Sequence, residues 1–231
     1  HPNTHKQFHI GHLRNISIGE SLVRLLEFAG AKVVRANYQG DVGLHVAKAI
    51  WGLKKQTDNG QLTIENLGKQ SLEERIKILG QVYAAASAAY EVDEIAKKEI
   101  IEINKAIYEQ SDQEVVALWR ETRQWSLDYF DQVYQRLDTR FDRFYFESEV
   151  HKRGKQVAEQ ALVAGILEKS QGAVVFNGDK YGLHTRVFLT KEGVPTYEAK
   201  ELGLAELEFS ELGQIDKCIH VVAPEQSSFF E

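Results

Sequence analysis

The chain has 231 residues, of which 43% are hydrophobic and 27% are charged, and its formal net charge at pH 7 is −6. This composition forms a buried core easily and excludes an intrinsically disordered chain. No apolar run approaches the roughly 18 residues of a membrane span, so no membrane partner is predicted. A single cysteine, Cys218, excludes an internal disulfide, and its apolar surroundings predict a buried core thiol in a reducing, cytoplasmic setting.

The charges are distributed unevenly along the chain. Residues 1–56 carry eight Lys or Arg and three Asp or Glu, a net charge of +5, whereas residues 57–150 carry −8 and residues 151–231 carry −3. The overall negative charge argues against indiscriminate nucleic-acid binding. The positive field of the first segment instead marks where a polyanion would bind.

The first elements in chain order are a helix, a strand, a glycine loop and a second helix. Apolar residues at helical spacing predict an amphipathic helix over residues 13–29, and Gly30 follows as a residue that takes positive φ without strain. The β-branched run "KVVRANY" at 32–38 predicts a short buried strand. The loop "QGDVG" then leads into a helix predicted over 44–55.

Residues 71–139 read as acidic helices whose aromatic side chains pack helix against helix. The remainder alternates between strand and helix patterns. In chain order these are a strand within 140–148, a helix over 150–165, an antiparallel pair at 172–176 and 183–193 around "NGDKYG", a helix over 196–209, and a buried strand at 217–223.

Together these patterns predict an α/β fold, a doubly wound parallel (Rossmann-like) sheet interrupted by a mainly helical insertion. Residues 1–56 would form the first half of a nucleotide-binding catalytic domain, and 195–231 would start its second half. Residues 57–194 would form the insertion, largely helical with a small sheet. The chain has no methionine and starts within a motif, so we expect it to be a piece of a longer protein.

The opening stretch "HPNTHKQFHIGHLRN" combines groups that suit a phosphate ligand. A helix that starts near Gly11 has unpaired N–H groups and a partial positive charge at its N-terminus, which attract phosphate. His9 and His12 lie on one side of its first turn and can donate hydrogen bonds, and Lys6 adds a mobile charge. These groups would stabilise a phosphate centre whose charge increases in the transition state.

Simpler interpretations exist for the same residues. Two histidines at i and i+3 without a carboxylate or thiol nearby are a poor metal site, so no metal ligands are predicted. Either histidine could cap the helix, and Pro2-Asn3 alone would be a turn.

Four segments carry a more specific signal when they are taken together. The stretches "PNTHKQFHIGHLRN", "VVRANYQGDVG", "GVPTYEAKELGLA" and "IHVVAPEQ" resemble, in this order, the catalytic domain of arginyl-tRNA synthetases, which are class I aminoacyl-tRNA synthetases. "HIGH" alone would indicate only the class I nucleotidyltransferase superfamily.

The resemblance implies ATP-dependent activation of L-arginine and its transfer to the 3′-terminal adenosine of tRNA(Arg), by a monomeric cytoplasmic ligase. ATP would be a substrate, with Mg²⁺ bound to its triphosphate. The implied catalytic residues are His9, His12 and Lys6, and ATP binding would also involve Gly11.

The resemblance also implies a set of arginine-binding residues: Asn3 for the α-amino and carboxylate groups, Tyr197 and Glu201 for the guanidinium, and Gln226 nearby. Glu201 is a departure, since the family usually has aspartate there. The i, i+4 spacing still puts Tyr197 and Glu201 on one helix face. The alternative is that Glu201 is a solvated helix residue and another acid binds the guanidinium.

Two parts of the family pattern are not in this sequence, namely the downstream lysine loop and the helical anticodon-binding domain. The isolated piece is therefore expected to be weakly active or inactive. The competing interpretations are a different class I synthetase, or a non-catalytic module that is derived from a synthetase and binds tRNA or nucleotide.

Overall fold

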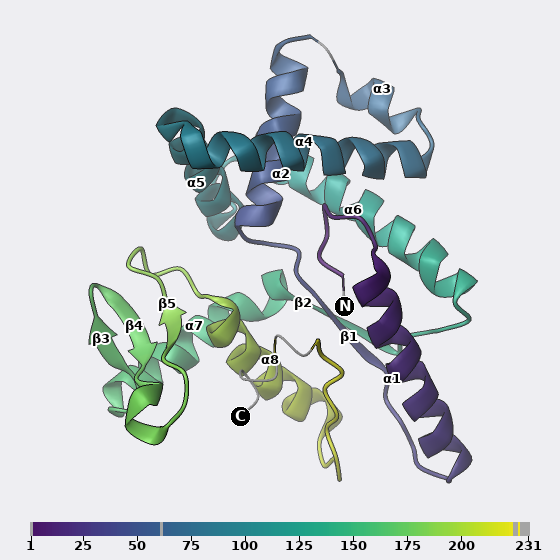
Figure 1. The fold of residues 1–231 in the computed structure, drawn as a ribbon, viewed down its shortest axis with the longest axis vertical. Coiled ribbons are helices and arrows are strands. Elements are labelled where there is room, and N and C mark those ends of the chain that lie inside the picture. The colour runs from purple at the N-terminus through teal and green to yellow at the C-terminus, as the bar shows by residue number, and fades with distance from the viewer. Residues whose placement is uncertain (1, 61, 224–225, 227–231) are drawn as a thin grey trace. The chain divides into compact units, whose positions relative to one another are not determined.

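A computed structural model describes residues 2–60, 62–223 and 226 (Figure 1). The chain is mixed α/β, mostly helical with small sheets. It divides into two compact units, His1–Phe144 and Tyr145–Glu231, called here the N-terminal and C-terminal units. The three-part division predicted from the sequence, at 56 and 194, stays a prediction.

The N-terminal unit is built mainly from helices whose ends carry the expected signals. Ser71 and Glu74 form a capping box at the start of the fourth helix, and Asp93 and Asp112 cap the next two. Its elements are α1 (Ile10–Phe28), β1 (Ala36–Gln39), α2 (Leu44–Asp58), α3 (Ile64–Gly68), α4 (Leu72–Val92), α5 (Glu94–Glu109) and α6 (Gln113–Arg136), and β2 (Arg143–Phe146) crosses into the second unit. Strands β1 and β2 form a two-stranded sheet.

The core of the N-terminal unit lies among α2, α4, α5 and α6, which confirms the predicted helix-on-helix packing of the acidic middle segment (Figure 1). Trp119 and Trp125 of α6 are both buried in it. Gly52 of α2 lies directly against α4, because a β-carbon there would be 2.6 Å from the Val82 carbonyl oxygen. Glycine thus allows the two helices to approach closely.

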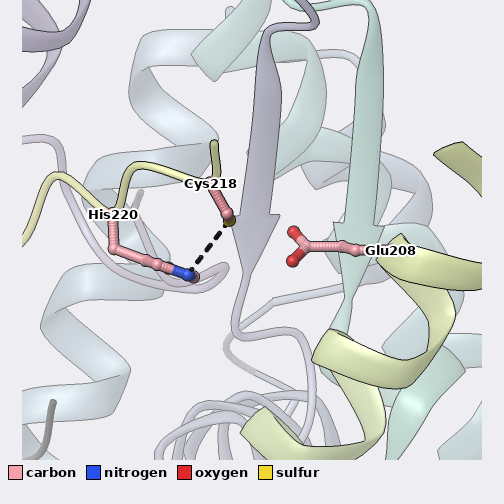
Figure 2. Close-up of side chains that lie close together, drawn as sticks. All are labelled: Glu208, Cys218 and His220. Atoms are coloured by element: carbon pink, nitrogen blue, oxygen red, sulfur yellow. Dashed lines mark hydrogen bonds between the residues drawn. The ribbon is translucent and has the colours of Figure 1, made fainter. Parts of the chain in front are cut away.

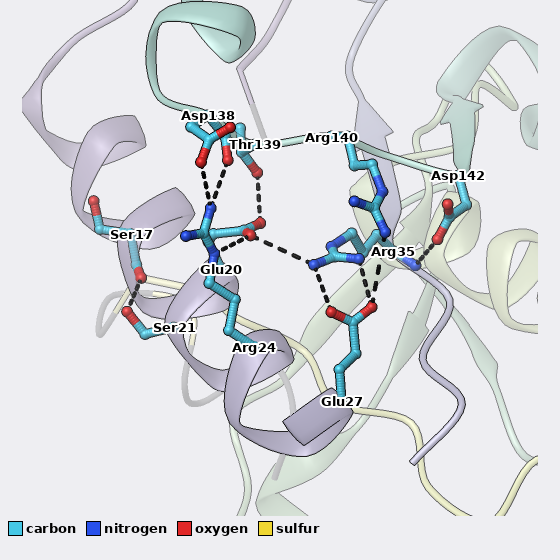
Figure 3. Close-up of polar contacts among 10 residues, drawn as sticks. All are labelled: Ser17, Glu20, Ser21, Arg24, Glu27, Arg35, Asp138, Thr139, Arg140 and Asp142. Carbon is cyan, nitrogen blue, oxygen red and sulfur yellow. Dashed lines mark hydrogen bonds and ion pairs between the residues drawn. The ribbon is translucent and has the colours of Figure 1, made fainter. Parts of the chain in front are cut away.

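Helix α1 differs from the other long helices because none of its residues is buried. It is held by ion pairs to the segments that flank the small sheet (Figure 3). The Arg35 guanidinium binds both carboxylate oxygens of Glu27, at 2.6 and 3.0 Å, and lies 3.4 Å from Glu20. Arg24 pairs with Glu20 at 2.7 Å and with Asp138 at 3.0 Å. Ion pairs therefore attach α1 to the rest of this unit, a role that apolar packing has for the other long helices.

The same residues, together with Thr139 and Arg140, line a hollow of about 280 Å³. Its acidic and basic groups are paired with one another, and Thr139 donates a hydrogen bond to Glu20 at 2.8 Å. Because the charges are matched, this hollow is a packing network and not a site for an anion.

The C-terminal unit consists of two packed helices and a three-stranded sheet. Its elements are α7 (Glu147–Val163), β3 (Glu168–Ser170), β4 (Ala173–Phe176), a short 3₁₀ helix η1 (Gly178–Tyr181), β5 (Arg186–Leu189) and α8 (Tyr197–Leu212). Strand β4 pairs antiparallel with β3 and with β5, which confirms the predicted antiparallel pair around "NGDKYG". The core of this unit contains side chains of α7, of the sheet and of α8.

Two predicted strands differ in the structure. The run at 32–38 forms a strand only from Ala36, since Arg35 is held by Glu27 and its carbonyl oxygen accepts hydrogen bonds from the Asp142 and Arg143 N–H groups. Residues 217–223 form no strand, and the strand predicted there is wrong. A buried strand needs a hydrogen-bonded neighbour, and no described strand pairs with this run. The doubly wound parallel sheet is accordingly not formed by the residues that the structure describes.

No helix in the described ranges is both long and apolar enough to cross a bilayer.

Candidate functional site

His9 and His12 come together at the N-terminus of α1. Their rings stack with centroids 3.7 Å apart and planes inclined by 25°. His9 is the N-cap residue, and its Nδ1 accepts a hydrogen bond from the Gly11 N–H at 3.1 Å; the Nδ1 of His12 accepts one from the His9 N–H at 3.2 Å. The two side chains thus form a reciprocal cap of the kind that Ser and Glu usually make. The capping interpretation and the same-side placement are both confirmed.

These contacts fix which ring nitrogens are available for a ligand. A neutral imidazole whose Nδ1 accepts a hydrogen bond carries its proton on Nε2. Burial lowers the pKa of His12 to about 4, and the neighbouring His9 and Lys6 act in the same direction. His12 is therefore neutral at pH 7, and both rings can present an Nε2–H donor. Glycine at position 11 leaves room for the His9 ring, because a β-carbon there would lie 3.0 Å from that ring.

Asn3 and Lys6 lie in the turn that precedes α1, and both are half-buried. The Lys6 ammonium group lies 5.1 Å from the centre of the Tyr83 ring on α4, an attractive cation–π arrangement. The Thr4 N–H donates to the Gly40 carbonyl oxygen at 2.9 Å, which ties this turn to the "QGDVG" loop.

His5 is a residue that the sequence analysis missed. It is 1% exposed, with φ +61°, and its ring nitrogens lie 2.9 Å from the Thr4 hydroxyl and 2.8 Å from the Thr122 hydroxyl. Its backbone N–H donates to the Ser126 hydroxyl. Burial lowers the pKa of His5 to about 3, so the ring is neutral and anchors the turn with Asn3 and Lys6 to α6. Only the tertiary contacts distinguish it from the other histidines nearby.

The glycine loop after β1 is anchored to α6 as well. Asp41 is fully buried and its carboxylate lies 2.7 Å from the Arg123 Nε. Its carbonyl oxygen accepts a hydrogen bond from the Trp119 indole at 2.8 Å. The turn before α1 and the loop after β1 are thereby both held on α6, through His5 and Asp41 respectively.

In the C-terminal unit, Tyr197 and Glu201 lie one turn apart on α8, as the spacing predicted. Glu201 is only 8% exposed, so the interpretation of it as a solvated helix residue is wrong. Burial raises the pKa of Glu201 to about 7; the Tyr197 hydroxyl opposes this effect, and the Glu208 and Glu147 carboxylates add to it. Burial also raises the pKa of Tyr197. A cationic ligand would stabilise the ionised form of this buried carboxyl, which burial by itself disfavours.

Gln226 is half-buried, and its side-chain oxygen accepts a hydrogen bond from the Ala223 N–H at 3.3 Å. It belongs to the C-terminal unit with Tyr197 and Glu201, whereas Asn3 and the histidines belong to the N-terminal unit. The predicted site residues thus fall into two groups, one in each unit: the N-terminal unit holds Asn3, Lys6, His9, Gly11 and His12, and the C-terminal unit holds Tyr197, Glu201 and Gln226. Cys218 is exposed, and the prediction of a buried core thiol is wrong, because residues 217–220 do not enter a sheet.

The sequence model of class I tRNA synthetases (R), catalytic domain, matches residues 1–231. The chain belongs to this family. The resemblance seen in the four motifs is confirmed, and the competing interpretation as a different class I synthetase is wrong.

Curated relatives agree with this assignment. The arginine–tRNA ligase of Bdellovibrio bacteriovorus is 33% identical over all of this chain, and that of Amoebophilus asiaticus is 31% identical. The chain spans about two fifths of their length, 39% and 40% respectively. A crystal structure of arginyl-tRNA synthetase from Plasmodium falciparum aligns with a TM-score of 0.74 at 21% identity, over 99% of this chain and 37% of that one. At this identity the match supports the fold.

Proposed function

We propose that the full-length protein activates L-arginine with ATP and transfers it to tRNA(Arg), as a monomer in the cytoplasm. The observation that carries this proposal is the His9–His12 pair at the N-terminus of α1, in a chain that belongs to the class I (R) family. In the full-length protein β1 would belong to a doubly wound parallel sheet, at whose switch point such ligands bind.

Charge and position explain how this site would act on ATP. The arginine carboxylate is ionised at pH 7 and needs no general base to attack the α-phosphate. The bond to pyrophosphate breaks as the new bond to phosphorus forms. The Nε2–H groups of His9 and His12 would donate to phosphate oxygens on which negative charge increases, and Lys6 would supply a positive charge. Mg²⁺ would enter with the triphosphate, since the groups at this helix end are N–H donors and an ammonium, not carboxylates.

Tyr197 and Glu201 on α8 would provide the specificity for arginine. Asn3 would hold the α-amino and carboxylate groups, and Glu201 would pair with the guanidinium beside Tyr197, with Gln226 close to the ligand. A neutral analogue such as citrulline would leave the Glu201 carboxylate buried without a partner, which is costly. We therefore expect rejection of citrulline without an editing step.

The experiment is arginine-dependent ATP–pyrophosphate exchange by the full-length protein, with and without tRNA. Glu201→Gln removes a charge-assisted pair and should raise KM for arginine at least about tenfold while changing KM for ATP little. Glu206→Gln is the matched control, since Glu206 lies on the same helix but pairs with Arg153 on the surface. Exchange that is absent even with tRNA would favour the non-catalytic module. An unchanged KM for arginine in Glu201→Gln would mean that another acid binds the guanidinium.

A further inference from the structure

Glu208, Cys218 and His220 form a cluster of three different metal-ligating side chains in the C-terminal unit (Figure 2). One ligand atom from each lies within 4.8 Å of the other two. The Cys218 Sγ and the His220 Nε2 are 3.4 Å apart, and Glu208 comes from α8. Glu208 is buried, whereas Cys218 and His220 are exposed, so the cluster opens to solvent on one side.

The local backbone explains why the cysteine and the histidine meet. Side chains two residues apart lie on the same side of an extended chain. In the irregular segment 217–223 this brings Cys218 and His220 together, while the intervening Ile219 is 45% exposed. The last turns of α8 then supply the acid from a different part of the sequence.

The separations suit a small tetrahedral ion. Zn²⁺ binds Cys sulfur at about 2.3 Å and His nitrogen or carboxylate oxygen at about 2.0–2.2 Å, so its ligand atoms are about 3.3–3.8 Å apart. The cysteine and histidine atoms are already at this separation. The Glu208 oxygen would have to move by no more than about 1.5 Å, which a change of its side-chain torsions allows.

The cluster is not suited to nucleophilic catalysis. A reactive thiol needs a lowered pKa, but partial desolvation of the sulfur by its neighbours raises the pKa of Cys218 and the Glu208 charge adds to that effect. A divalent cation would instead lower the pKa of Cys218, because it binds the thiolate and is attracted by the same carboxylate.

We propose that Glu208, Cys218 and His220 bind one Zn²⁺ ion, with a water molecule as the fourth ligand. On binding, the Cys218 S–H bond breaks, the proton passes to solvent and a Zn–S bond forms. The ion links the segment 217–223 to the C-terminal half of α8. This proposal does not depend on the catalytic residues of the proposed function.

The first test is titration of the full-length protein with Co²⁺ and then Zn²⁺, under a reducing agent that does not bind metal. Bound Co²⁺ should give a thiolate-to-cobalt charge-transfer band and the intense visible bands of four-coordinate cobalt, at one ion per chain. Zn²⁺ should displace it with a dissociation constant of up to about 1 μM, since three protein ligands bind less tightly than the four of a structural site. A protein without a saturable site of this kind would overturn the proposal.

Substitutions assign the ligands. Cys218→Ser should abolish the charge-transfer band, and His220→Asn or Glu208→Gln should weaken binding at least about 10- to 100-fold, since even outer-sphere changes have effects of that size. His184→Asn and Glu206→Gln, which lie outside the cluster, are the matched controls and should bind as the parent does. Parent-like affinity in His220→Asn and Glu208→Gln would show that the ion is held elsewhere.

A third measurement needs no substitution and so does not depend on the variants folding. Zn²⁺ should slow alkylation of the Cys218 thiol, followed by mass spectrometry of the peptide that contains it, at least about tenfold. Mg²⁺ at the same concentration, which prefers oxygen ligands, should not. An alkylation rate that Zn²⁺ leaves unchanged would contradict the site.

Discussion

Gly154 of α7 lies so close to α8 that a β-carbon on it would be 2.1 Å from the Ala199 carbonyl oxygen. Gly203 of α8 faces the same contact, where a β-carbon would be 2.5 Å from the Val150 carbonyl oxygen. Two helix backbones thus touch at a pair of glycines. The helix that carries Tyr197 and Glu201 is positioned by this contact.

Gly154→Ala should therefore destabilise the protein, because the methyl group must push two backbones apart. Overpacking of this kind typically costs about 1–3 kcal/mol. The measurement is urea-induced unfolding of the full-length protein. Gly68→Ala is the control, since Gly68 ends α3 and has open space around it, and it should be neutral or slightly stabilising. Equal stability of the two variants would contradict the close contact.

His5 should make stability fall with decreasing pH. Its folded-state pKa of about 3 lies below its usual 6.5, so the unfolded state takes up the proton first as the pH falls. The stability advantage of the neutral ring is complete above pH 6.5 and is lost at about 1.4 kcal/mol per pH unit down to about pH 3. His5→Asn, which tolerates positive φ and cannot be protonated, should reduce this slope; His184→Asn, an exposed control, should not. Equal slopes in the parent and His5→Asn would refute the assignment.

Arginine binding should depend on the ionisation of Glu201. The pKa of about 7 means that protons compete with the guanidinium, so the dissociation constant for arginine should rise about tenfold for each pH unit below 7. In the absence of ligand, the free energy of unfolding depends on pH in the opposite direction. The raised pKa of Glu201 stabilises the folded state fully below about pH 4.5, and this contribution is lost as the pH rises from 4.5 to 7. Calorimetric titration with arginine between pH 5.5 and 8 measures the first effect. Glu201→Gln should bind weakly at every pH, and a parent profile without slope would exclude Glu201 as the contact.

The two roles of the histidine pair can be separated by amide substitutions. The Asn side chain places an acceptor near the position of the His Nδ1, which keeps the cap, whereas the Gln amide reaches the position of Nε2. If the Nε2–H groups stabilise charge on phosphate, His9→Asn and His12→Asn should lower kcat for ATP–pyrophosphate exchange about 10²–10³-fold, and the Gln variants should retain more activity. Thermal unfolding should show the reverse order. Asn variants with full activity would leave only the capping role.

The sequence by itself determined the local elements and the family. Helices α4, α5 and α6 begin directly after Ser71, Asp93 and Asp112 because these side chains accept hydrogen bonds from N–H groups two or three residues later, a contact that depends on spacing alone. The hairpin of β4 and β5 was predicted from its turn residues for the same reason. The stacked His9 and His12 also follow from local geometry, since the two residues lie three positions apart at the first turn of one helix.

The tertiary structure decided everything that depends on burial between distant segments. His5 is one of several histidines in its segment, and only packing against Thr122 and Ser126 makes it neutral. The sequence around Glu201 is equally compatible with a solvated acid on a helix surface, and only the packing of α8 shows that the side chain is buried and its pKa raised. The apolar run 217–223 has strand composition but no described strand to pair with, so Cys218 lies at the surface beside His220 and Glu208. Desolvation and strand pairing are set by neighbours far along the chain, and no local pattern contains them.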